Sequence, residues 1–359
     1  MRGSPELPDD DRLRSRTARD RRLRRAMPWM IGSGIGAGAI AAIVTSSGGP
    51  GDLGGALDRV TAGWTLLAAL AMLTGYLLLA LHMRRLTPAP LSLWRAAGAD
   101  LLLFGLGNLL PGAPAPGALL AARELRHAGL AARQARLVLA FTAWFNIRTL
   151  LGLGAVVSLA AFARQHPGLR EAGLWWVGAV AVLLLLAATA RLAARQHTAE
   201  RTAQILAHVR IGRLAPPAAL NPTSAGAWHA DAKRLVGAPA NRALLVSLAL
   251  AAWLADAACL WAALAAAGVR LDTDIVLLAY VAGILASGIP FLPGGIGAVE
   301  ATIPAVLHSF GANLDQALAG SLHYRGISAL LPAIGGAVLL AGTGWFRGGR
   351  HRLARRAPG

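Results

Sequence analysis

The sequence has few of the residues on which soluble enzymes rely for chemistry and solubility. Only 14% of its 359 residues are charged, and it has one cysteine, one lysine and three tyrosines. With Cys259 alone, neither an intrachain disulfide nor a cysteine-built metal site can form. The His-Glu-x-x-His, Gly-x-Ser-x-Gly and Walker Gly-Lys-Ser/Thr patterns are also missing. We therefore expect no catalytic residue, no metal and no cofactor, and an ATP-driven pump is disfavoured.

The chain is instead rich in long apolar stretches. Its composition is 55% apolar and its mean hydropathy is +0.52, both typical of a protein that crosses a membrane several times. We predict an all-α polytopic membrane protein with about six full transmembrane helices and two re-entrant, or short paired, helical hairpins. The full spans are expected at about residues 28–47, 62–82, 137–163, 173–190, 241–267 and 316–346.

Positive charge dominates, and its placement indicates membrane topology rather than nucleic-acid binding. The net charge is +18, and the arginines fall in blocks beside apolar segments. The prediction is a multi-pass protein of the plasma (inner) membrane, with both termini in the cytoplasm and no nucleic-acid partner. All but six of the 35 basic residues then lie on the cytoplasmic side; the exceptions are Arg59, Arg164, Arg170 and Arg270 outside, and Arg148 and Arg325 within spans.

Three regions follow from this pattern. Residues 1–27 are expected to form a disordered basic cytoplasmic tail, residues 28–346 the membrane domain, and residues 347–359 a second basic cytoplasmic tail. Within the membrane domain, residues 196–240 form the one sizeable polar stretch and are expected to be a cytoplasmic linker with an interfacial helix at 198–211.

Two apolar stretches are interrupted by residues that break a helix. Residues 288–300 read Gly-Ile-Pro-Phe-Leu-Pro-Gly-Gly-Ile-Gly-Ala-Val-Glu. Irregular backbone survives at membrane depth only where it is wrapped in protein or lines a wet cavity. We therefore expect residues 275–310 to form a hairpin entered from outside. A similar break at residues 110–117, with arginines on both sides, predicts a hairpin entered from the cytoplasm.

The two broken segments also resemble each other. Leu110-Pro111-Gly112 and Leu292-Pro293-Gly294 match, and Gly129 and Gly311 each lie 18 residues after the proline. Gln134-Ala135 and Gln316-Ala317 match as well. Hairpins opening from opposite faces correspond to an inverted repeat, in which broken segments meet near the bilayer midplane and form a substrate site.

Three charged residues lie deep inside predicted spans and are candidates for that site. Arg148 and Arg325 are expected roughly 15 to 18 Å inside their helices, and Glu300 follows the break. Each arginine could pair with a buried carboxylate, for which Glu300, Asp100 and Asp256 are available. Alternatively, its guanidinium binds a lipid phosphate. The two roles coexist if Glu300 holds Arg325 until an anionic headgroup replaces it.

The glycines of the break supply a second kind of candidate. Gly294, Gly295 and Gly297 would let backbone N–H groups approach a ligand, and a helix beginning near Ala298 would direct its positive end at an anion. The same residues also suit a simple tight turn. Four neighbouring residues are expected to form hydrogen bonds between helices, with Asn108 and Tyr324 as further candidates for contact with substrate; the four are Asn108, Asn146, His323 and Tyr324.

Residues 292–301, with His323-Tyr324-Arg325, resemble the transmembrane region of lysylphosphatidylglycerol synthases and their stand-alone flippase-like relatives. The resemblance also covers Asn-Leu-Leu-Pro-Gly at 108–112, Arg-Glu-Leu-Arg-His-Ala-Gly at 123–129, and Arg148, and it extends from about residue 30 to 346. It implies an integral membrane domain that, in the bifunctional synthases, moves aminoacylated phosphatidylglycerol between leaflets. The chain departs from the relatives at Gly117-Ala118 and Ile147-Arg148, where they often have Gly-Glu and Glu-Arg.

Our leading hypothesis is therefore a flippase-like translocase whose partners are membrane lipids, acting on an anionic phospholipid or lipid-linked headgroup. We expect no lysyl transfer, because no aminoacyl-transfer domain is expected after Phe346. The alternative is a non-transporting scaffold for a separate lipid synthase or glycosyltransferase, bound through residues 196–240. An intramembrane enzyme acting on polyprenyl-phosphate lipids is a third hypothesis, but it lacks a nucleophile or metal site.

Overall fold

The computed structural model describes residues 61–106 except 89, residues 115–164, residue 236, residues 239–287, residue 295 and residues 297–342. All secondary structure in these ranges is helical. The elements are α3 (Ala62–Leu86), α4 (Leu93–Asp100), the π-helix η1 (Leu101–Leu106), α6 (Ala115–His127), α7 (Ala132–Ala163), α12 (Pro239–Ala266), α13 (Thr273–Ser287), α14 (Ala298–Ser309), α15 (Leu314–Arg325), the π-helix η4 (Gly326–Leu330) and α16 (Leu331–Gly342). The predicted spans at 28–47 and 173–190, both tails and most of the linker 196–240 lie outside the described residues.

Four helical segments are long and apolar enough to cross a membrane: α3, α7, α12 and the continuous stretch Leu314–Ala341. They have 25 to 32 residues, so they reach about 37 to 48 Å and exceed a hydrocarbon core of about 30 Å. The prediction of a polytopic all-α membrane protein is confirmed. Helix α7 begins at Ala132 rather than at Leu137, because the Gln134 side chain accepts a hydrogen bond from the Ala131 N–H and caps an earlier turn.

Helix α3 has one face suited to lipid and another packed on protein. Leu66, Leu70, Leu73 and Leu77 recur at helical spacing and are 47 to 62% exposed. On the packed side a Cβ at Gly75 would lie 3.4 Å from the backbone oxygen of Ala252, so α3 crosses α12 closely. Acyl chains would cover the leucine face in a bilayer, while the crossing holds α3 and α12 together.

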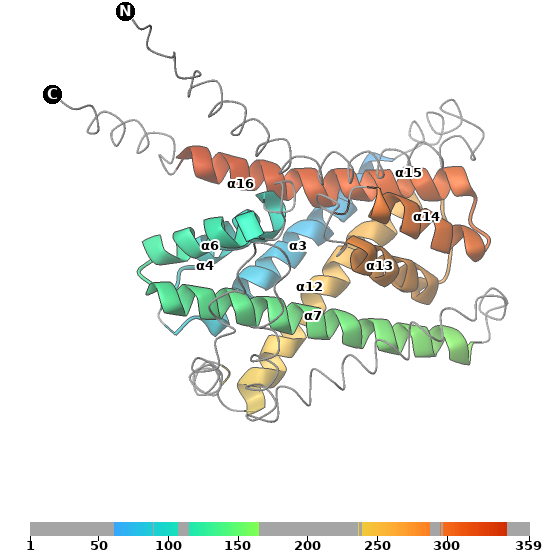
Figure 1. The fold of residues 1–359 in the computed structure, drawn as a ribbon. Helices are drawn as coiled ribbons and strands as arrows, with labels where there is room; N and C mark the ends of the chain where they lie inside the picture. The colour runs from blue at the N-terminus through green and yellow to red at the C-terminus, as the bar shows by residue number, and fades with distance from the viewer. Residues whose placement is uncertain are drawn as a thin grey trace, which may run out of the picture.

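Two long helical segments lie on opposite sides of the crossing between α3 and α12 (Figure 1). In Figure 1, α7 and the continuous α15–η4–α16 run in opposite directions, and α3 and α12 lie between them. Helix α13 packs on α7, and η1 packs on α16. Each side of the molecule is thus joined to a short helix from the other half of the chain.

The internal repeat has a structural counterpart. A glycine with positive φ follows the end of each of α6 and α14, with φ of 99° at Gly129 and 93° at Gly311. The next N–H then bonds back to a leucine carbonyl, from Leu130 to Leu125 and from Ala312 to Leu307. The same sequence interval separates each matched pair, and α7 and α15 begin at equivalent positions. The side of the membrane from which each hairpin opens stays a prediction.

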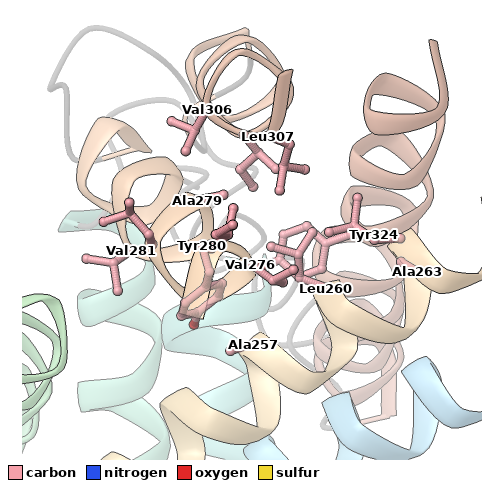
Figure 2. Close-up of a cluster of buried hydrophobic side chains, with 14 of the residues drawn as sticks. Ala257, Leu260, Ala263, Val276, Ala279, Tyr280, Val281, Val306, Leu307 and Tyr324 are labelled. Atoms are coloured by element: carbon pink, nitrogen blue, oxygen red, sulfur yellow. The ribbon is translucent and has the colours of Figure 1, made fainter. Parts of the chain in front are cut away.

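The helices assigned to each predicted hairpin are in contact with each other. In the first, α4 and η1 pack on α6, and in the second, α13 packs on α14. Figure 2 shows the second hairpin closing over α12 and α15 through Leu260, Val276, Val306 and Leu307. This apolar cluster surrounds Tyr280 and Tyr324, which are 0% and 1% exposed. The core therefore fixes two hydroxyl-bearing side chains in the interior.

The contact between η1 and α16 generates a test of the fold. A Cβ at Gly105 would lie 2.6 Å from the backbone oxygen of Pro332, so Gly105→Ala must push η1 away from α16. We expect a loss of about 1–3 kcal/mol, measured as a lower thermal unfolding temperature in detergent. The matched control is Gly152→Ala, where no atom lies within 4 Å of the added Cβ. An equal effect of the two substitutions would contradict the close packing.

Candidate functional site

Glu300 is fixed by the start of its own helix. Helix α14 begins at Ala298, as predicted, after the N-cap residue Gly297 with φ of 88°. The Glu300 Oε2 atom accepts a hydrogen bond of 2.7 Å from the Gly297 N–H. Glu300 is only 5% exposed. Pro304 has no N–H to donate to the Glu300 carbonyl four residues earlier, so the helix is also weakened at this point.

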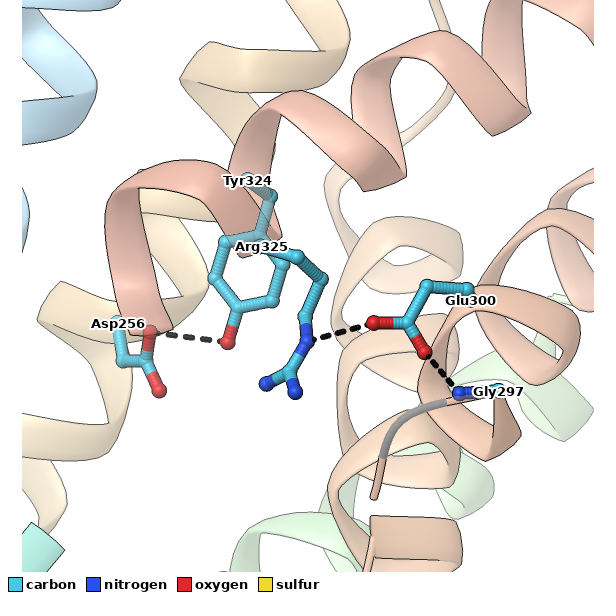
Figure 3. A network of polar contacts seen from close by, with 5 residues as sticks. All are labelled: Asp256, Gly297, Glu300, Tyr324 and Arg325. Carbon is cyan, nitrogen blue, oxygen red and sulfur yellow. Dashed lines mark hydrogen bonds and ion pairs between the residues drawn. The ribbon is translucent and has the colours of Figure 1, made fainter. Parts of the chain in front are cut away.

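Arg325 completes an ion pair with this carboxylate. Its Nε donates to Glu300 Oε1 at 2.9 Å, and the two side chains are 17% and 6% exposed. Arg325 ends α15 just before the π-helix η4, inside the apolar stretch Leu314–Ala341. Figure 3 shows its terminal nitrogens pointing away from Glu300. Of the three carboxylates predicted as partners, Glu300 is the one that forms the ion pair.

The Glu300 carboxylate occupies two donors that suit an anion. One is a backbone N–H at a helix N-terminus, and the other is the guanidinium N–H of Arg325. Both were predicted from the sequence as donors to an anionic headgroup. The protein's own carboxylate therefore occupies both donors.

A second carboxylate lies on the other side of Arg325. Asp256 accepts hydrogen bonds from Tyr280 at 2.8 Å and from Tyr324 at 3.0 Å, and it interacts electrostatically with Arg325. Tyr76 is also within electrostatic reach of Asp256. All three tyrosines of the chain are thus gathered around one aspartate. The predicted hydrogen bond from Tyr324 to another helix is confirmed.

Further contacts hold α12 in place beside this network. Trp253 donates from Nε1 to the Asn146 carbonyl of α7 at 3.0 Å, and its ring lies 6.4 Å from that of Tyr280. Asn146 therefore takes part in a hydrogen bond between helices, as expected, but through its backbone carbonyl, because its side chain donates to the Thr142 carbonyl of its own helix. His323 does link helices, through Thr65 of α3 at 3.1 Å. The short side-chain amide of Asn146 reaches the Thr142 carbonyl one turn back, so its hydrogen bond forms within α7.

Arg148 is placed differently from Arg325. Its guanidinium lies over the Trp144 ring, 4.6 Å from the centroid, which is a cation–π contact one turn away on α7. No contact with Glu300, Asp100 or Asp256 is found for it within the described residues. The described contacts do not bring Arg148 to the Glu300 and Arg325 pair.

Of the remaining candidate residues, the structure describes Gly295 and Asp100. Gly295 has φ of 68°, and a Cβ there would lie 2.5 Å from Ser287, so the break folds closely onto α13. Asp100 is fully buried, and its carboxylate oxygens have no hydrogen-bond partner among the described residues. Gly294 and Asn108 lie outside the described residues. Where the chain is described, no group of acidic, histidine or cysteine side chains is arranged to hold a metal ion.

The sequence prediction missed Tyr280. The available signal was that a tyrosine within the apolar run of α13 must find a hydrogen-bond partner, and Asp256 is the acidic residue in the neighbouring apolar helix.

The tyrosine contacts yield a double-mutant test. Tyr324→Phe removes one donor to Asp256, so its destabilising effect of about 1–3 kcal/mol should shrink when Asp256 is already Ala. The measurement is thermal unfolding of the single and double variants in detergent. Tyr76→Phe is the control, because the Tyr76 hydroxyl makes no hydrogen bond to Asp256 in the described structure. Additive effects for Tyr324 and Asp256 would contradict the contact.

Comparison with known proteins gives one result that covers most of the chain. Residues 29–336 match the family described as the lysylphosphatidylglycerol synthase TM region. A search of curated proteins gives no match. The match includes both hairpins, the Glu300 and Arg325 ion pair, and the four long apolar segments almost to their end. The chain therefore belongs to the family of the lysylphosphatidylglycerol synthase transmembrane region.

Proposed function

We propose that the protein is a flippase-like lipid translocase that binds an anionic phospholipid, or a lipid-linked anionic headgroup, at Arg325. The observation that carries the proposal is the buried Glu300 and Arg325 ion pair at the N-terminus of α14. Family membership supports a membrane protein of lipid metabolism or transport. Ionisable groups within spans usually belong to a substrate pathway, which favours a transport role for this pair.

The proposed binding step is an exchange of anions. A headgroup phosphate takes over the Arg325 and Gly297 donors, and Glu300 swings away. Guanidinium geometry suits the exchange, because its fork binds carboxylate and phosphate oxygens in the same manner. Gly295 and Gly297, which precede α14, have positive φ values that glycine adopts and leaves at little steric cost, and this favours the proposed movement.

The exposed apolar surface of α3 supports the proposed path for the lipid. The leucine face of α3 is suited to acyl chains, while the charged network lies among α12, α13, α14 and α15. A phospholipid has the same two parts, an apolar tail and a charged headgroup. The proposal places the tail along the apolar exterior and the headgroup at Arg325. Arg148, over Trp144, is proposed as a second phosphate contact along the path.

A liposome assay tests the proposed function. We expect reconstituted wild-type protein to transfer fluorescently labelled phosphatidylglycerol between leaflets. The double variant Glu300→Gln/Arg325→Ala should transfer it at least about tenfold more slowly, because it lacks the charge-assisted contacts. Replacing both partners avoids leaving the Glu300 carboxylate buried without its counter-charge.

The matched control removes another ion pair. Arg164 and Asp274 join α7 to α13 at 3.4 Å, but the Arg164 side chain is 60% exposed. The double variant Arg164→Ala/Asp274→Asn should keep the wild-type transfer rate. Equal transfer rates for wild type and the Glu300→Gln/Arg325→Ala variant would contradict the proposed site.

A further inference from the structure

We propose that binding of the anionic headgroup at Arg325 is coupled to uptake of one proton by Glu300, so that lipid and proton are bound together. The inference rests on the proposed function and adds its coupling ion. It starts from the charge count in the described network, where two carboxylates, Glu300 and Asp256, lie around the single guanidinium of Arg325.

An arriving phosphate changes the surroundings of Glu300 more than those of any other group. Glu300 has two described partners, the Gly297 N–H and Arg325 Nε, and the exchange removes both. In the paired state Glu300 is only 5% exposed, so it begins the exchange with little access to water. A buried carboxylate without a partner is unfavourable, and such a group is normally neutralised by a proton. Glu300 therefore becomes protonated as the phosphate takes its place.

Asp256 keeps its partners in the same step. Its oxygens accept from Tyr280 and Tyr324, and neither tyrosine is a donor that the phosphate takes. Its carboxyl group stays beside Arg325 with both tyrosine contacts in place, so Glu300 is the carboxylate that the phosphate displaces.

Three other titratable groups, one on each of α14, α15 and α13, have described contacts of their own. On α14, His308 bonds to the Ala312 carbonyl, and on α15, His323 faces Thr65 of α3. On α13, Asp274 pairs with Arg164. The groups facing Asp256 from the elements packed around it are Tyr76 on α3, Cys259 on α12 itself, Tyr280 on α13, and Tyr324 and Arg325 on α15. Glu300 is the one whose described partners the exchange replaces.

The charges balance in this scheme. One phosphodiester anion enters with one proton, so the net charge of the occupied site equals that of the empty site. Because a phosphodiester does not titrate between pH 5 and 8, the proton is taken up by the protein. A difference in proton concentration across the membrane can then drive lipid in one direction, because each bound headgroup carries one proton with it.

Proton uptake can be measured directly on the wild-type protein. Dihexanoyl phosphatidylglycerol is titrated into purified protein in non-ionic detergent, in weak buffer with a pH-indicator dye, while binding is followed by calorimetry. We expect about one proton per bound lipid, and a dissociation constant that rises about tenfold per pH unit wherever free Glu300 is ionised. Glu300→Gln should bind the lipid without proton uptake and without this pH dependence.

Asp274→Asn is the control, and it should take up the proton as wild type does. Lipid binding without proton uptake, or uptake that persists in Glu300→Gln, would overturn the coupling and leave the proposed function standing. Uptake lost in Asp256→Asn but kept in Glu300→Gln would likewise overturn the assignment to Glu300. No binding of the lipid, together with no leaflet transfer in liposomes, would overturn the proposed function itself.

Discussion

A buried ion pair between Glu300 and Arg325 is the interaction on which the rest of this structure depends. Two charges held at 6% and 17% side-chain exposure must compensate each other, because neither can be left alone in the interior without a cost of several kcal/mol. The pair fixes α14 against α15, and through the Gly297 N–H it also fixes the start of α14. Arg325 in turn lies beside Asp256, which two tyrosines connect to α13 and α15. Four helices are thereby held around one guanidinium.

The repeated architecture explains why this network lies where it does. Matched hairpins place two short helical arms against the long helices of the opposite half, with α13 on α7 and η1 on α16. The apolar cluster closes around the tyrosines, while leucines cover the outer face of α3. The halves are not equivalent in chemistry, because the matched interval does not place Arg148 opposite Arg325. The first half stacks its arginine on Trp144, and the second half pairs its arginine with Glu300.

Much of this could be predicted from the sequence, for identifiable reasons. Apolar run length located α3 and α12, and the glycines before Ala298 located the start of α14. A deep arginine required a carboxylate, and the sequence offered Glu300, Asp100 and Asp256, with Glu300 considered as the partner of Arg325. Choosing among them needed the packing of α14 on α15. Neither π-helix has a sequence pattern that signals it, and the role of Tyr280 depends on a neighbour 24 positions away in the chain. Arg148 over Trp144 follows i, i+4 spacing and was open to prediction.

The central claim is that Arg325 holds either Glu300 or a lipid anion, and native mass spectrometry of the purified protein tests it most directly. Wild-type protein extracted in mild detergent should carry about one tightly bound anionic phospholipid per chain at acid pH, and its occupancy should fall as pH rises. The Glu300→Gln/Arg325→Ala variant should lose that lipid, while the Arg164→Ala/Asp274→Asn variant keeps it. The same anionic lipid at the same occupancy in all three proteins would contradict the account.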